Sequence, residues 1–199
     1  METYILEKEE ASFCIVEILG EHNREHLEKR VQYYQQNISV PFSFVGLIVE
    51  SWNHDLSPWS CLNFGQGAKS TYEELMTVLS SRKEVKYILS GYSLAGLFCL
   101  WVGYQTDFFD GIVACSPSVW FPYWDTYMQE HTFLASKVYL SLGDKEHKCK
   151  NRTMREVKNR ILLTQKMLNG TLEFNPGNHF QDVELRMLKG YQNVLKKGE

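Results

Sequence analysis

The sequence predicts an α/β fold, a three-layer α/β/α sandwich built around a mostly parallel, doubly wound β-sheet. Short runs of apolar and β-branched residues recur along the chain, and segments with helical periodicity separate most of them. Parallel neighbouring strands need a crossover connection, usually a helix, so this alternation favours a parallel sheet. The 199 residues contain no linker, internal repeat or low-complexity tract, and we expect one domain over residues 1–199.

The first predicted strand spans residues 12–19, an apolar and β-branched run that Gly20 closes. Residues 24–36 are polar, with apolar side chains at a spacing that predicts a helix: Leu27, Val31 and Tyr34. Residues 42–50 are nearly all apolar, as in a strand covered on both faces. The segment 51–58 is rich in turn residues and predicts a loop.

The middle of the chain predicts a helix, a strand and a second helix. Ser70 or Thr71 can cap a helix that runs to about Ser81, with glutamates in its first turn, where the helix dipole favours them. Residues 85–90 form the next strand, and residues 94–104 follow as a helix that is apolar on nearly every side. The last third continues the alternation, with strands at 111–115, 137–142 and 171–175 and helices at 152–168 and 182–196.

Charge and cysteine content argue against several classes of protein. Lys and Arg number 21 against 24 Asp and Glu, a formal net charge of -3, so the sequence lacks the basic surplus of a nucleic-acid-binding protein. The five cysteines are widely spaced and form no C-x-x-C, which predicts neither a disulfide framework nor a four-cysteine zinc site. The first ten residues are acidic where a secretory signal is basic and then apolar, and we expect a cytoplasmic protein.

One uncharged segment, residues 88–104, approaches the length of roughly 18–20 residues that a membrane span needs. Its serines and glycines cluster in the first half, however, which fits a strand, a tight turn and a buried helix better than one continuous helix. We therefore expect no membrane partner.

A nucleophile is predicted at the turn between the strand 85–90 and the helix 94–104. The segment there, Gly91-Tyr92-Ser93-Leu94-Ala95-Gly96, has the setting of a nucleophile elbow, although Ala95 stands where G-x-S-x-G has its second glycine. On such a turn Ser93 projects beyond the end of its strand, and the N–H of Leu94 can stabilise an oxyanion. The alternative is that Ser93 only belongs to a tight strand-to-helix connection.

A serine nucleophile needs a base and an acid that orients the base, and the chain supplies both in the order Ser, acid, His. His179 lies between the last predicted strand and the last predicted helix. Asp144 and Glu146 follow the strand 137–142, and we favour Glu146 because Asp144 can serve the turn itself. A surface role for His179 and a solvated charge at Glu146 are the alternatives.

Further pocket residues are expected from loops at the same edge of the sheet. The N–H of Glu21, directly after Gly20, is the predicted second oxyanion donor. Trp52 and Asp55 on the loop 51–58 are expected to shape substrate binding, although a stable turn would use the same residues. Trp120 belongs to an aromatic stretch after the strand 111–115 and predicts a partly apolar pocket, with core packing as the alternative.

The motifs resemble those of small α/β-hydrolases of the esterase group, which includes esterase D-like and siderophore esterases, and above all its compact, uncharacterised bacterial members. The matching segments span about Gly20 to His179 and are 52–59, 91–98, 116–121, 140–146 and 177–180. The resemblance implies a Ser93–His179 pair with Glu146 as third member, acting on esters through an acyl-enzyme. A Ser-His dyad occurs in this group and stays open.

The resemblance also implies that the strands before the usual third strand are reduced or missing, since little chain precedes Phe13. Such a loss could expose a sheet edge and allow a homodimer. We expect a carboxylic ester hydrolase that acts on a small-molecule ester without metal or organic cofactor. An acyltransferase or thioesterase with the same triad, and a catalytically idle binding protein, are the alternatives.

Two charged segments allow further interpretations. Residues 22–26 spell H-x-x-E-H, the string of an inverted zinc peptidase, but the surroundings are almost wholly polar, and a solvated first turn explains them better. Residues 145–160 hold seven basic side chains against two acidic ones. They predict either a solvated helix face or the attraction of an anionic substrate to the nearby site.

Overall fold

The computed structural model describes residues 1–61, 63–80 and 86–196, and its strands form one sheet in the order β1-β3-β2-β4-β5-β6-β7. All strand pairs are parallel except β1 with β3. The strands are β1 (Glu2–Leu6), β2 (Phe13–Gly20), β3 (Phe42–Val49), β4 (Lys86–Tyr92), β5 (Gly111–Cys115), β6 (Val138–Gly143) and β7 (Thr171–Asn175).

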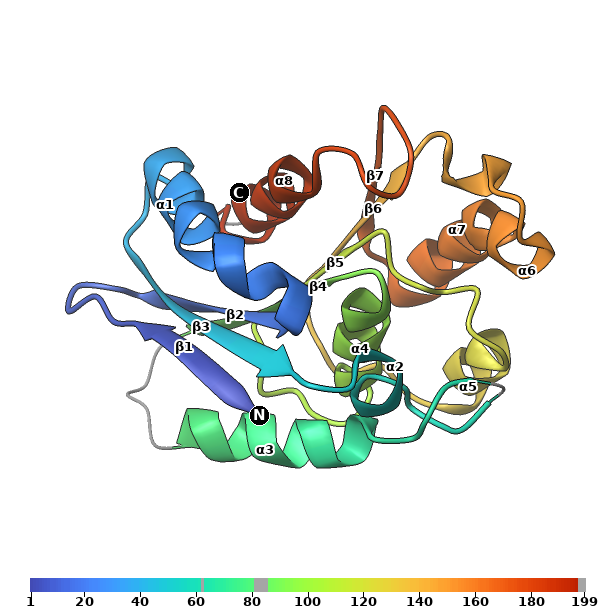
Figure 1. Cartoon of the computed structure of the whole chain (residues 1–199), viewed down its shortest axis with the longest axis horizontal. Coiled ribbons are helices and arrows are strands. Elements are labelled where there is room, and N and C mark those ends of the chain that lie inside the picture. The colour runs from blue at the N-terminus through green and yellow to red at the C-terminus, as the bar shows by residue number, and fades with distance from the viewer. Residues whose placement is uncertain (62, 81–85, 197–199) are drawn as a thin grey trace.

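Helices cover both faces of this sheet, and the predicted three-layer α/β/α class is confirmed (Figure 1). One face carries α1 (Leu27–Asn37) and α8 (Val183–Val194). The other face carries α3 (Ala68–Ser80), α4 (Leu94–Val102), α5 (Trp124–Glu130) and α7 (Val157–Leu168). None of the described helices is both long enough and apolar enough to cross a membrane.

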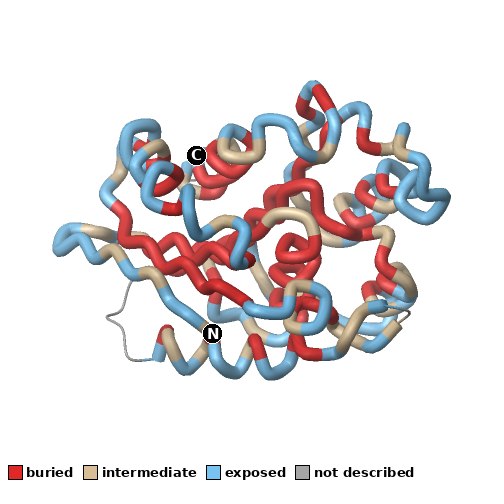
Figure 2. Tube along the Cα trace, viewed as in Figure 1, coloured by how far each residue is buried: buried red, intermediate tan, exposed pale blue. Residues whose placement is uncertain are grey.

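Strands β3, β5 and β6 are buried along their whole length, and Figure 2 shows the buried residues gathered in the middle of the sheet. Every residue of β3 is buried, which explains why its sequence lacks the alternation of a half-exposed strand. Apolar side chains from the two faces of the sheet pack into two separate clusters, one under each helical layer. The sheet therefore gives a rigid base for the loops at the carboxyl ends of its parallel strands.

Two sequence predictions fail near the N-terminus. Strand β1, which was not predicted, pairs with the edge of β3. Only Tyr4 and Leu6 of its five residues are partly buried, so it does not form a buried apolar run. The helix expected over 24–36 begins later, at Leu27, after the 3-10 helix η1 (Glu21–His26). Leu27 is the first buried residue of this segment, so regular packing against the sheet starts there. A homodimer through a sheet edge stays a prediction.

Other boundaries also differ from the predictions. The predicted loop 51–58 contains the short helix α2 (Trp52–Asp55). Helix α3 begins at Ala68, before the predicted caps, and the Thr71 hydroxyl donates to the Asp55 carbonyl instead of capping the helix. The helix expected over 152–168 is interrupted at Glu156, which leaves an exposed first turn, α6 (Arg152–Arg155), capped by Asn151. The predicted end of one helix at Ser81 and start of a strand at Val85 lie outside the described residues.

Candidate active site

The loops that follow four neighbouring parallel strands meet at one edge of the sheet. Ser93 follows β4, Ser116 follows β5, Glu146 follows β6 and His179 follows β7. Open α/β sheets bind ligands outside the carboxyl ends of their strands, so this edge is where a site is expected.

Ser93 occupies a sharp bend between β4 and α4. Its backbone has φ 59° and ψ −122°, a strained conformation for a residue with a side chain. The bend brings the two backbones so close that a Cβ added to Gly91 would lie 2.5 Å from the carbonyl carbon of Ala95. Leu94 begins α4, so its N–H belongs to the first turn, where N–H groups have no helical acceptor and can bind an oxyanion.

The structure brings Ser93, His179 and Glu146 into one hydrogen-bonded chain. His179 Nε2 lies 3.0 Å from Ser93 Oγ, and His179 Nδ1 lies 2.8 Å from Glu146 Oε2. An ionised carboxylate can only accept hydrogen bonds, so Nδ1 carries the imidazole proton. In the neutral ring Nε2 then accepts the hydrogen bond of the Ser93 hydroxyl. The arrangement allows the imidazole to take the serine proton.

The two oxygens of Glu146 have separate partners. Oε1 accepts hydrogen bonds from Gly143 N at 2.6 Å, Ser116 Oγ at 2.7 Å and Arg186 Nη1 at 3.1 Å. Oε2 faces His179. Burial by itself raises the pKa of Glu146, but hydrogen bonds from His179 and Ser116 outweigh it and lower this pKa from its ordinary value. The carboxylate is therefore ionised at neutral pH and orients the imidazole.

Asp144, the other acid considered from the sequence, has a different partner. Its Oδ1 accepts a hydrogen bond from Gly177 N at 2.9 Å, and its own N–H donates to the Asn175 carbonyl at 2.8 Å. Asp144 thus ties the loop after β6 to the loop after β7, which carries His179. The structure places Glu146, and not Asp144, against the imidazole.

Three residues around this chain were not assigned a role from the sequence. Ser116 has φ 44° and donates to Glu146 from the end of β5. Tyr92 donates to the His179 carbonyl at 2.8 Å, and burial raises the pKa of Tyr92 to about 12, so the phenol keeps its proton. Arg186 of α8 is fully buried. The Ser-Pro-Ser turn 116–118 is the one local signal that points to any of them.

Two cavities open beside Ser93 and His179. The first, which we call the polar cleft, has a volume of about 470 Å³ and is lined by several charged residues together with Leu19, His22 and Trp52. The charged members are Glu17, Arg30, Asp182 and Glu184, and Arg30 forms ion pairs with both glutamates. The second, the apolar cavity, has a volume of about 350 Å³; Trp120, Met154, Val157 and Phe180 are among the residues that line it.

The predicted pocket residues are only partly brought together. Trp52 lines the polar cleft and Trp120 lines the apolar cavity, whereas Asp55 lines neither. Its carboxylate accepts a hydrogen bond from Ser51 N at 2.8 Å and lies 3.0 Å from His54, so it closes the turn that contains α2. A role in a stable turn was the alternative that the sequence allowed for Asp55.

Glu21 begins η1 directly after β2, and its exposed carboxylate pairs with Arg24. Its neighbours Leu19 and His22 both line the polar cleft. Gly20 lets the backbone pass close to the side chains of His22 and Trp52, because an added Cβ would lie 2.8 Å from both. An oxyanion role for the Glu21 N–H stays a prediction.

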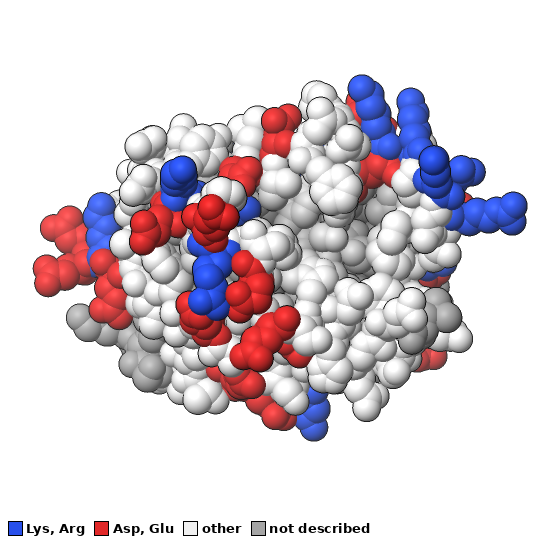
Figure 3. All heavy atoms as spheres, in the orientation of Figure 1, with Lys and Arg blue, Asp and Glu red and all other residues white. Residues whose placement is uncertain are grey.

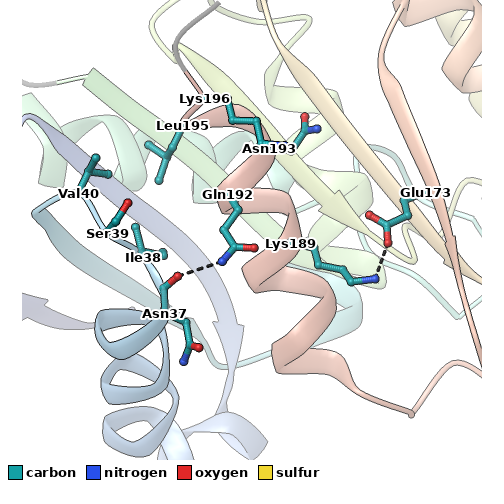
Figure 4. A pocket seen from close by; sticks show the side chains of 10 residues that line it. All are labelled: Asn37, Ile38, Ser39, Val40, Glu173, Lys189, Gln192, Asn193, Leu195 and Lys196. Carbon is teal, nitrogen blue, oxygen red and sulfur yellow. Dashed lines mark hydrogen bonds and ion pairs between the residues drawn. The ribbon is translucent and has the colours of Figure 1, made fainter.

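Residues 22–26, which spell the zinc-peptidase string, lie in a 3-10 helix, which does not give His22 and His26 the spacing of one α-helical face. Within residues 1–61, 63–80 and 86–196, no three His, Cys, Asp or Glu side chains gather in a way that could hold a metal ion. A further cavity of about 510 Å³ lies away from Ser93, between the ends of α1 and α8, where Lys189 pairs with Glu173 (Figure 4).

Comparison with solved structures finds similar folds among esterases. The siderophore hydrolase EstA from Aspergillus nidulans is 15% identical, with a TM-score of 0.67 over 94% of this chain and 83% of that one. Est1E from Butyrivibrio proteoclasticus is 13% identical, with a TM-score of 0.67 over 98% and 93%. The S-formylglutathione hydrolase from Staphylococcus aureus is 10% identical, with a TM-score of 0.63 over 95% and 84%.

No family model and no curated protein matches the sequence. At these identities the structural likeness establishes the fold and leaves the chemistry to be argued from the site. The architecture confirms the resemblance that the motifs indicated: the chain has the α/β-hydrolase fold.

Proposed function

We propose that this protein is a serine hydrolase that cleaves carboxylic esters through an acyl-enzyme. The observation that carries the proposal is the hydrogen-bonded chain from Ser93 Oγ through His179 to Glu146, built on a strained turn at the edge of the sheet. A tight strand-to-helix connection alone does not require an imidazole within hydrogen-bond distance of the serine. The names of the structural neighbours, which are esterases and related hydrolases, support the same class of reaction.

The geometry supports the following reaction. Ser93 Oγ attacks the ester carbonyl while His179 Nε2 takes the hydroxyl proton, and Glu146 stabilises the imidazolium that forms. The N–H of Leu94, and in our proposal that of Glu21, binds the oxyanion of the tetrahedral intermediate. When the intermediate collapses, the C–O bond to the alcohol breaks and the alcohol leaves with the proton from His179. Water then attacks the acyl-enzyme by the same route and releases the acid.

Covalent labelling tests the proposal. A fluorophosphonate is expected to modify the protein once, at Ser93, and peptide mass spectrometry locates the adduct. The variant Ser93→Ala should take up no label, whereas Ser141→Ala, which removes a buried serine that lines neither cavity, should be labelled like the wild type. p-Nitrophenyl esters with acyl chains of two to twelve carbons, given to wild type and Ser93→Ala, then report turnover. Unlabelled wild-type protein would indicate an idle site, and a labelled Ser93→Ala would indicate another nucleophile.

Basic side chains gather at one end of the face shown in Figure 3, over the region of η2 (Glu146–Lys148) and α6. Four of them, exposed and without an ion pair among the described residues, are Lys145, Lys148, Lys150 and Arg152. Cys149 and Met154 from the same segment line the apolar cavity. In our proposal this positive field raises the local concentration of esters that carry a negative charge.

Added salt is therefore expected to lower kcat/KM for an anionic ester by up to about tenfold, because it screens exposed charges. A neutral ester of the same chain length should change little. The measurement is kcat/KM for both esters against NaCl concentration, on wild type and on the triple variant Lys148→Glu, Lys150→Glu, Arg152→Glu. Equal salt responses of the two esters on the wild type would mean that the segment is only a solvated helix face.

A further inference from the structure

Arg186 is an arginine with no exposed surface, and its guanidinium lies between the loops that carry Glu146 and His179. It comes from α8, the helix after the His179 loop. Removing a guanidinium from water costs several kcal/mol unless good partners replace the water. Both terminal nitrogens of Arg186 have such partners, whereas Nε has none among the described residues. The partners of Arg186 indicate what this charge does in the site.

The two terminal nitrogens of Arg186 contact different loops. Nη1 donates to Glu146 Oε1 at 3.1 Å, with Ser116 Oγ at 3.2 Å and Tyr92 OH at 2.9 Å as further acceptors. Nη2 donates to the carbonyls of Pro176 at 3.2 Å and Asn178 at 2.9 Å. One rigid, planar group therefore holds the acid and the main chain on either side of Gly177.

A third carbonyl of the His179 loop, that of His179 itself, is held by Arg186 through Tyr92. Tyr92 accepts a hydrogen bond from Nη1 and donates its own to the His179 carbonyl at 2.8 Å. The carbonyls of Pro176, Asn178 and His179 are thus all fixed by Arg186 or by its partner. Meanwhile the donors on Glu146 Oε1 leave Oε2 as the oxygen that faces the imidazole.

We propose that Arg186 is the positioning residue of this site: its guanidinium holds Glu146 and the His179 loop in one frame, so that Glu146 Oε2 meets His179 Nδ1. This inference rests on the proposed ester hydrolysis. Lysine could not replace the function fully, because an ammonium is a point charge, whereas the guanidinium fork reaches acceptors on both loops at once. Arg186 does not touch the reacting atoms and acts through Glu146 and His179.

The charge of Arg186 also affects the pH at which Glu146 ionises. The groups in contact with the Glu146 carboxylate are His179, Ser116, Arg186 and the Gly143 N–H, and Tyr92 lies one hydrogen bond further away. Without the guanidinium, the buried carboxylate would lose a cation and become easier to protonate, so its pKa would rise. Because the triad needs an ionised Glu146, losing the Arg186–Glu146 ion pair moves the acid limb of the activity profile to higher pH.

The test compares Arg186→Met, Arg186→Lys and the control Lys189→Met. Lys189 lies one turn further along α8 and pairs with Glu173, so its loss removes a cation from the same helix without touching Glu146 or His179. kcat and KM for a p-nitrophenyl ester are measured against pH and divided by the folded fraction from circular dichroism. Arg186→Met is expected to lose about 10²-fold in kcat with little change in KM, as for misplaced catalytic groups.

The pH profile separates positioning from stability. We expect the acid limb of the pH profile of Arg186→Met to move to higher pH. Arg186→Lys should keep the acid limb of the wild type and have a kcat between those of the wild type and Arg186→Met. Lys189→Met should match the wild type in both. If Arg186→Met does not fold, Arg186→Lys alone still tests the proposal through its intermediate kcat.

Two results would overturn this role for Arg186: an unchanged kcat per folded molecule in Arg186→Met, or a lower kcat with the acid limb in its wild-type place. If Arg186→Lys is the only variant of Arg186 that folds, a kcat of Arg186→Lys equal to that of the wild type would also overturn this role. Failure of the proposed function gives a different result, because wild-type protein would then neither be labelled at Ser93 nor hydrolyse the ester.

Discussion

Replacing His179 with alanine is expected to lower kcat by about 10⁶-fold and to leave KM nearly unchanged. His179 Nε2 lies 3.0 Å from Ser93 Oγ, where it can take the hydroxyl proton during attack and return it to the leaving alcohol. The substrate contacts these groups most strongly in the transition state, so their loss reduces kcat more than ground-state binding. Steady-state kinetics with a p-nitrophenyl ester measures both constants.

The double variant makes this prediction specific. Ser93 and His179 act as a unit if one moves the proton of the other, so Ser93→Ala/His179→Ala should be hardly slower than either single variant. Additive losses would show that the two residues work independently. His147→Ala is the matched control, because His147 lies directly after Glu146 and lines neither cavity. A mild loss in His179→Ala together with a large one in His147→Ala would reassign the base.

The sequence predicted β5, inside the sheet, and β7, at one edge, better than β1 at the other edge. Strands β5 and β7 have the predicted bounds, because each is a short apolar or β-rich run with turn residues at its ends. Strand β1 was missed, since only Tyr4 and Leu6 of its five residues are even partly buried, which leaves no apolar run. The first turn of α3 contacts a residue further back in the chain, Asp55, through Thr71, and periodicity does not contain such contacts.

The residues of the candidate site were also predicted only in part. Ser93, Glu146 and His179 could be found because the topology of an α/β sheet requires such residues after particular strands, and each follows one. Arg186 could not be found in this way. It lies on the closing helix, and an arginine usually faces water, so only the packing of α8 against the loops reveals that it is buried. Asp55 shows the opposite case, an acid near the site whose partners lie in its own turn.

Glu146→Gln is expected to lower kcat by about 10⁴-fold, the loss known for replacing a triad carboxylate by its amide. Glutamine keeps the shape but places an amide where Oε2 now accepts from His179 Nδ1. If the amide nitrogen faces the ring, Nδ1 must become the acceptor, and Nε2 then carries the proton and cannot take one from Ser93. The measurement is kcat at neutral pH, where the lowered pKa of Glu146 keeps the wild-type carboxylate ionised.

Asp144→Asn is the matched control, because it changes an acid two residues away whose carboxylate holds Gly177 and not the imidazole. Its loss of one charge-assisted hydrogen bond should reduce stability by about 1–3 kcal/mol, with a much smaller effect on kcat per folded molecule. A large loss in Asp144→Asn and a small one in Glu146→Gln would exchange the two acids. Small losses in both would mean that Ser93 and His179 work as a dyad, and that the hydrogen bonds on Glu146 serve to fold the loop. Because the three mechanisms predict three different pairs of kcat values, these two variants distinguish among them.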